Sequence, residues 1–202
     1  KADPVPDTTA DKYAQRKLAR EYAQGCAERT GKAMLQQMTT PNTVRDLDVI
    51  RAALGERKLN FLGVSYGTYL GAVYGTMFPG HLRRMVVDSV VNPSREKVWY
   101  EANLDQDVAF EGRWKDWQDW VAANDATFHL GTTRAAVQAK WLELRATAKK
   151  NPIGGVVGPA ELISFFQSAP YYDSSWVPVA TVFSAYFAGD TGLFASMAEE
   201  VG

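Results

Sequence analysis

The chain has 202 residues, of which 46% are hydrophobic and 22% are charged, and its formal net charge is -1. This composition is typical of one large or two small globular domains, and it lacks the basic footprint of proteins that bind nucleic acid or anionic membranes. No apolar run approaches the roughly 20 residues of a membrane-spanning helix. Cys26 is the only cysteine, so an internal disulfide and a cysteine metal cluster are excluded, and we expect no metal or cofactor. Cys26 is either a buried thiol or the partner of a cysteine on another segment.

The first part of the chain predicts two helices. Residues 12–38 predict an interrupted helix, one face of which carries Leu18, Tyr22 and Cys26. Residues 43–54 predict a second helix, because Thr43 and Asp46 have the spacing of a capping box and Gly55 supplies a stop.

Two strands and a connecting helix are expected next. "LNFLGV", residues 59–64, and "RRMVVDSVV", residues 83–91, are nearly continuous apolar runs, which are typical of parallel strands buried on both faces of a sheet. Between them, residues 66–78 predict a helix that ends at Pro79. A strand, a helix and a second strand in this order predict a parallel crossover unit.

Strand signals nearly vanish after Asn92, and the rest of the chain predicts helices. They are expected over 96–123, 132–149, 159–167, 175–188 and 191–200. Trp114, Trp117 and Trp120 recur at three-residue spacing, as expected on one side of a helix. The sequence therefore predicts an α/β protein with a partial α/β core in residues 1–95 and a helical cap in residues 96–202.

Ser65 stands at the corner between the first strand and the helix that follows. Gly63 and Gly67, two positions before and after it, leave room for a strained turn that would expose the Ser65 hydroxyl at the carboxyl end of the sheet. The backbone N–H of Tyr66 would point the same way and stabilise an oxyanion. We therefore expect Ser65 to be a catalytic nucleophile. The alternative is that the two glycines serve only a tight turn and Ser65 caps the helix.

Residues 42–94 resemble the nucleophile region of the α/β-hydrolase peptidases grouped with prolyl iminopeptidase, and most of all the secreted bacterial tripeptidyl aminopeptidases. The resemblance is carried by "RDLD", "GVSYGT" and "FPGHLRRMVVD". It implies part of an α/β-hydrolase fold with a helical cap. It also implies a secreted serine exopeptidase that cleaves near a free N-terminus, releasing tripeptides through an acyl-enzyme on Ser65. The chemistry of the Ser65 turn alone also permits an esterase or lactonase, because it does not fix which bond is cleaved. A noncatalytic binding scaffold is a distant third alternative.

The histidine base and acid of such an enzyme are not evident in the sequence. His81 follows the helix that begins at Ser65, about 18 Å away along that helix, and His129 lies in the helical part. Asp88 is interpreted as structural. We therefore expect the base, the acid, further strands and a second oxyanion loop to come from segments upstream and downstream. We expect residues 1–202 alone to be inactive and poorly folded.

The helical cap should select the substrate, and its partner should be a peptide rather than nucleic acid or membrane. An exopeptidase of this family needs an anion for the substrate ammonium and a pocket for its side chains. The candidates are Asp107, Glu111, Asp173, Tyr171, Tyr172 and Trp176. Solvated surface charge is the alternative for the acids, and core packing is the alternative for the aromatic residues.

Overall fold

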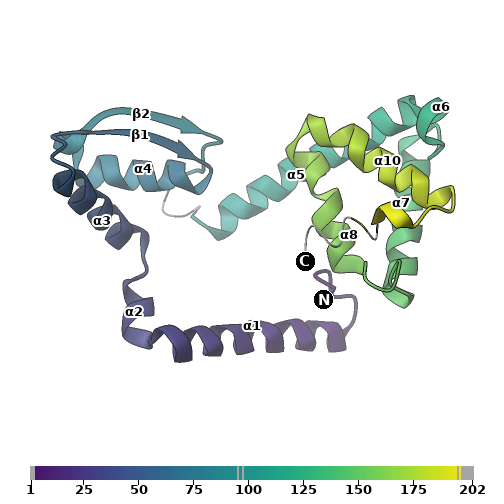
Figure 1. Ribbon diagram of the computed structural model, residues 1–202, viewed down its shortest axis with the longest axis horizontal. Helices are drawn as coiled ribbons and strands as arrows, with labels where there is room; N and C mark the ends of the chain where they lie inside the picture. The colour runs from purple at the N-terminus through teal and green to yellow at the C-terminus, as the bar shows by residue number, and fades with distance from the viewer. Residues whose placement is uncertain (1–2, 95, 97, 195, 197–202) are drawn as a thin grey trace. The chain divides into compact units, whose positions relative to one another are not determined.

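The structure is a computed structural model that describes residues 3–94, 96, 98–194 and 196 (Figure 1). It forms two compact units. The α/β unit comprises Arg20–Asp105, and the helical unit combines Lys1–Ala19 with Gln106–Gly202. The residues before Arg20 thus group with the helical unit, whereas the sequence places them in the core. In the described ranges, no helix has the length and apolar character that crossing a membrane requires.

The elements follow in chain order. The first part holds α1 (Thr9–Thr30), α2 (Lys32–Gln37), α3 (Thr40–Ala53), β1 (Leu59–Val64), α4 (Tyr66–Met77), the 3-10 turn η1 (Pro79–His81) and β2 (Leu82–Asp88). The second part holds α5 (Tyr100–Ala123), α6 (Asp125–Phe128), α7 (Arg134–Lys150), α8 (Pro159–Phe166), α9 (Ser168–Tyr171), the 3-10 turn η2 (Asp173–Ser175) and α10 (Trp176–Phe187).

β1 and β2 pair in parallel, as the sequence predicts, with Phe61 opposite Met85. α4 lies along one face of this pair (Figure 1). Close packing depends on Gly71 of α4, because a Cβ there would lie 2.7 Å from Cε1 of Phe61 and 3.1 Å from Sδ of Met85. A parallel pair with its connecting helix on one face is the local frame that positions the residue between β1 and α4.

The opposite face of the two strands is open. Leu62 is 70% exposed, Val64 56% and Val86 60%. Among the described residues α4 covers one face only, so the other apolar face of both strands is exposed. The apolar run of each strand gives no information about which elements cover it.

The boundaries of the first helices differ from the predicted ones. α1 ends at Thr30 because Gly31 takes a φ of 82°, and α2 starts at the next residue. The face of α1 that carries Leu18, Tyr22 and Cys26 is not buried, since no residue of α1 is buried and Tyr22 is 78% exposed. Cys26 is a half-buried free thiol in the part of the chain that the structure describes.

α3 begins three residues earlier than predicted. Its N-cap is Thr39, whose hydroxyl accepts a hydrogen bond from the Asn42 N–H at 3.4 Å. The capping box of Thr43 and Asp46 is therefore wrong, because both residues already lie inside the helix. Gly55, with a φ of 72°, follows the end of the helix as predicted.

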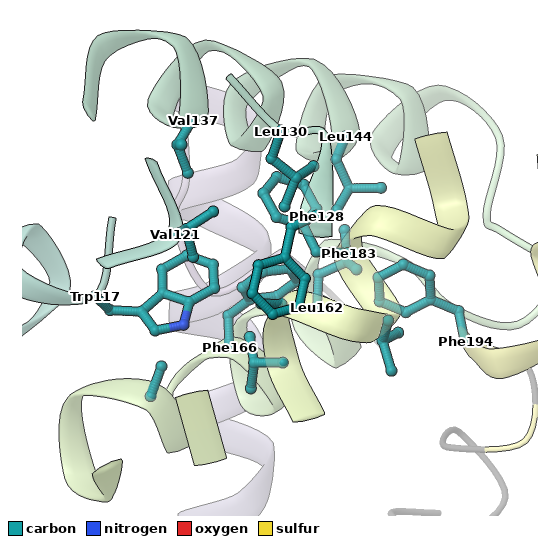
Figure 2. Close-up of a cluster of buried hydrophobic side chains, with 14 of the residues drawn as sticks. Trp117, Val121, Phe128, Leu130, Val137, Leu144, Leu162, Phe166, Phe183 and Phe194 are labelled. Atoms are coloured by element: carbon teal, nitrogen blue, oxygen red, sulfur yellow. The ribbon is translucent and has the colours of Figure 1, made fainter. Parts of the chain in front are cut away.

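The helical unit has its own hydrophobic core, built mainly from α5, α7, α8 and α10 (Figure 2). Of the three tryptophans predicted on one side of α5, Trp117 is fully buried, and Trp114 and Trp120 pack at its margin. The helices predicted over 132–149, 159–167 and 175–188 are confirmed as α7, α8 and α10. Of the helix predicted over 191–200, residues 192–194 and 196 are helical, and residues 195 and 197–200 lie outside the described residues.

Candidate active site

Ser65 occupies a strained corner between β1 and α4. Its φ of 55° and ψ of -121° lie in a region that side-chain-bearing residues rarely adopt. The residue is exposed. Such a corner between a strand and a helix is the geometry in which a serine hydroxyl is lifted away from the backbone, as the sequence predicts.

The two glycines beside Ser65 have different environments. A Cβ at Gly63 would lie 2.4 Å from the carbonyl oxygen of Gly67 and 2.7 Å from Cε1 of Phe61, so this position has no space for a side chain. A Cβ at Gly67 would meet no described atom within 4 Å. The sequence argument treats the two positions alike, whereas the packing of the described residues requires a glycine only at Gly63.

Hydrogen bonds hold the backbone of the corner from both sides. The N–H of Ser65 donates to the carbonyl oxygen of Asp88 at 3.0 Å, and the Thr68 hydroxyl donates to the Ser65 carbonyl oxygen at 2.7 Å. The same Thr68 Oγ1 accepts from the N–H of Val91 at 3.0 Å. The buried Thr68 therefore links the corner to the segment after β2. Sequence reasoning missed this role, although a threonine three residues after the serine is the available signal.

The Ser65 hydroxyl is not used to cap α4. Among the described residues it makes no capping hydrogen bond to that helix, so the alternative in which Ser65 is a helix cap is not supported. The N–H of Tyr66, the first residue of α4, has no carbonyl within the helix to bond. An exposed hydroxyl therefore lies beside the positive end of a helix dipole, where a developing negative charge is stabilised.

His81 lies at the other end of α4, in η1, and belongs to a polar cluster. Oδ1 of Asp48 on α3 accepts three hydrogen bonds, from Arg51 Nε at 2.8 Å, the Tyr74 hydroxyl at 2.9 Å and His81 Nδ1 at 2.7 Å. The His81 ring also stacks on Phe78, with ring centres 5.8 Å apart. His81 thus joins the end of α4 to α3, and α4 separates it from Ser65, as the sequence predicts.

The cluster keeps Asp48 ionised. The hydrogen bond from Arg51, together with those from His81 and Tyr74, lowers the pKa of Asp48 well below its ordinary value, although partial burial acts in the opposite direction. Burial and the neighbouring Asp48 raise the pKa of Tyr74. A carboxyl whose pKa is lower in the folded state stabilises the fold above its unfolded pKa of about 4, and this stabilisation is lost as the pH falls through the folded value.

Replacing Asp48 with asparagine should lower the melting temperature at neutral pH, because the asparagine carries no charge for Arg51 and His81. The gap in melting temperature between wild type and Asp48→Asn should narrow as the pH falls below about 4, because the unfolded carboxyl then binds a proton that the folded carboxylate does not, and this stabilisation is lost as the pH falls towards the lowered folded pKa. Thermal unfolding between neutral and acid pH measures this. Asp46→Asn is the matched control, since Asp46 is exposed on the same helix. A gap that stays constant with pH would contradict the assignment.

His129 is exposed in the helical unit. It ends α6 with a φ of 54°, and its N–H donates to the carbonyl oxygen of Asp125 at 2.8 Å.

The predicted substrate residues of the helical unit fall in two places. Tyr171, Tyr172, Asp173 and Trp176 gather beside α5: Tyr171 packs edge-on against Phe110 at 4.5 Å and stacks on Tyr172 at 5.7 Å. Arg113 of α5 forms an ion pair with Asp173 and lies over the Trp176 ring, 4.9 Å from its centre. Asp173 thus already has a cationic partner.

Glu111 lines a separate cavity of about 590 Å³ between α5 and α7, and its carboxylate is 3.1 Å from Nζ of Lys115. Asp107 is exposed one turn earlier on α5. The two predicted acids of α5 therefore do not join the cluster around Asp173. Within the described ranges, no group of three or more His, Cys, Asp or Glu side chains is placed to hold a metal ion.

Comparison with known proteins identifies the family. Residues 15–182 match the alpha/beta hydrolase fold. The chain is 80% identical over 191 residues to a tripeptidyl aminopeptidase of Streptomyces lividans, covering 95% of this chain and 35% of that relative. It is 33% identical over 145 residues to serine protease Hip1 of Mycobacterium tuberculosis, covering 71% of this chain and 26% of that protein. The chain thus spans about a third of the length of the curated relatives that it matches, and it belongs to the alpha/beta hydrolase fold family.

Proposed function

We propose that the protein is a serine exopeptidase that cleaves peptides near a free N-terminus and releases tripeptides through an acyl-enzyme on Ser65. The observation that carries this proposal is the Ser65 corner, where the hydroxyl is exposed, leaves the helix uncapped among the described residues and adjoins the N–H of Tyr66. The similarity to a tripeptidyl aminopeptidase supports the choice of a peptidase over other hydrolases. Membership of the prolyl iminopeptidase group and secretion are parts of the same proposal.

In the first step, Ser65 Oγ attacks the carbonyl carbon of the scissile amide and gives up its proton to a base. The N–H of Tyr66 stabilises the oxyanion that forms. The C–N bond then breaks, and the amine leaves with a proton from the base. The acyl part of the substrate remains bound to Ser65 as an ester. Water hydrolyses this ester in the same manner and frees the peptide.

The base and its acid belong to segments other than the 202 residues in this proposal. Two observations support it: His81 lies at the far end of α4 from Ser65 and is hydrogen-bonded to Asp48 of α3, and the relatives are about three times as long as the chain. The further strands and the second oxyanion donor belong to the same segments. The partner is a peptide, and neither nucleic acid nor a membrane is a partner in this proposal.

A substrate panel tests the reaction class in the full-length protein. Tripeptidyl arylamides, single-residue arylamides and simple aryl esters should be compared by kcat/KM. An exopeptidase that releases tripeptides should prefer the tripeptidyl arylamides and should lose activity when their N-terminus is acetylated. Hydrolysis of aryl esters alone would favour the esterase reading. A fluorophosphonate probe that labels a residue other than Ser65 would contradict the proposed nucleophile.

A further inference from the structure

The side chain of Tyr66 is held in place by a residue distant in sequence. Its hydroxyl lies 2.8 Å from Oγ1 of Thr40, the first residue of α3. The two residues are 26 positions apart, so this hydrogen bond joins the start of α3 to the start of α4. It also fixes the ring of the residue that directly follows the proposed nucleophile.

Aromatic packing fixes the same ring from another side. The Trp99 ring centre is 5.3 Å from that of Tyr66 and 5.0 Å from that of Tyr69, which it meets edge-on. Such aromatic pairs stabilise each other beyond the area that they bury. Tyr66 and Trp99 therefore form an aromatic wall beside the corner.

This wall bounds a groove of about 710 Å³, which we call the Tyr66 groove. Its other side is formed by Met34 and Met38 near the end of α2 and by the first turns of α3. The volume is within the roughly 300–1,000 Å³ of small-molecule sites. Methionine side chains are flexible and polarisable, so they adapt to apolar groups of different shape.

The charges along the Tyr66 groove give no preference for a charged ligand. Arg45 and Asp46 are neighbours on α3, both line the groove and their charges have opposite signs. Nη1 of Arg45 also donates to Oδ1 of Asn42 at 2.6 Å. The uncharged polar part of the lining comes from Gln37, Thr39, Thr40, Asn42 and Thr43, and the aromatic and methionine side chains are the part that offers a contact surface to an apolar group.

We propose that the Tyr66 groove receives an apolar side chain of the substrate residue beside the scissile bond, and that Thr40 is the positioning residue that holds Tyr66 as its wall. This inference rests on the proposed function. Tyr66 supplies the oxyanion N–H with its backbone and one wall of the groove with its side chain. The groove and the oxyanion N–H therefore share Tyr66, the residue that directly follows Ser65.

The experiment measures side-chain selectivity in the full-length enzyme. One series uses Ala-Ala-Xaa-p-nitroanilide, in which Xaa carries the attacked carbonyl, and the other uses Ala-Ala-Ala-Xaa-Ala, in which Xaa leaves. Xaa is leucine or glutamate in each. Selectivity is the ratio of kcat/KM for leucine to that for glutamate, and the series that responds identifies the residue in the groove. Rates are normalised to the amount of enzyme labelled by a fluorophosphonate.

Met38→Lys places a positive charge in the groove at an exposed position, so selectivity for leucine should fall by about tenfold or more in one series. Thr40→Val removes the hydroxyl but keeps the shape, and it should lower the same ratio. Thr40→Ser should restore it. Thr76→Val is the matched control, because the Thr76 hydroxyl bonds only to the Ala72 carbonyl oxygen in the described part of α4. It should leave the ratio unchanged.

A purely structural effect of Thr40 would lower kcat/KM equally for the leucine and the glutamate substrate of a pair. The ratio of the two values is therefore decisive. Unchanged ratios in both series for Met38→Lys and Thr40→Val, with Ser65 still labelled, would overturn the groove assignment alone. Full hydrolysis by Ser65→Ala would instead overturn the proposed function. The two failures are therefore distinguishable.

Discussion

Ser65→Ala in the full-length protein should lower kcat on a tripeptidyl arylamide by a factor on the order of 10⁴ to 10⁶. The substitution removes the oxygen that forms the acyl-enzyme, and the described residues of the corner offer no second nucleophile in its place. KM should change much less, because substrate contacts elsewhere remain. Labelling by a fluorophosphonate should disappear, and the melting temperature should stay close to that of the wild type, because the exposed hydroxyl does not cap α4.

Ser89→Ala is a close control for this experiment. Ser89 is also exposed, it also has a positive φ, of 54°, and it follows the end of the neighbouring strand β2. It lacks the glycine before it and the helix after it that define the Ser65 corner. Ser89→Ala should keep activity and labelling. Loss of labelling in Ser89→Ala, with Ser65→Ala unaffected, would move the nucleophile to the second strand.

The elements around Ser65 could be predicted because their signals are local. An apolar run, two glycines and a Pro-Gly stop are contiguous in sequence, so β1, α4 and β2 agree with the structure to within a few residues. The start of α3 could not be placed so well, because several threonines and an asparagine there offer competing caps. The structure selects Thr39, which leaves Thr40 free to contact Tyr66.

Contacts between distant residues were the part that sequence reasoning could not reach. Asp48 and His81 are 33 positions apart, and neither residue has a local pattern that names the other. The same holds for Thr40 and Tyr66. The substrate residues of the helical unit are predicted from residue type alone. The structure gathers four of them and pairs Asp173 with Arg113. A carboxylate that looks free in sequence can therefore already have a partner.

Gly63→Ala should be far more damaging than Gly67→Ala, although both glycines belong to the same motif. A methyl group at Gly63 would lie 2.4 Å from a backbone carbonyl oxygen, which no side-chain rotation can relieve. The backbone of the corner must shift instead. Overpacking of this kind typically costs about 1–3 kcal/mol of stability, and a displacement of about 1 Å at a reacting group can lower the rate about a hundredfold.

The damage done by Gly71→Ala should lie between that of Gly63→Ala and that of Gly67→Ala. Its methyl group would meet the side chains of Phe61 and Met85, which can partly move. The three variants should be compared in the full-length protein by melting temperature and by kcat/KM per fluorophosphonate-labelled enzyme. Melting temperature and kcat/KM should fall most in Gly63→Ala, less in Gly71→Ala and least in Gly67→Ala. A loss in Gly67→Ala as large as that in Gly63→Ala would show that atoms beyond the described residues occupy the space beside Gly67. In that case the corner would be shaped by a contact with another segment as well as by its own turn.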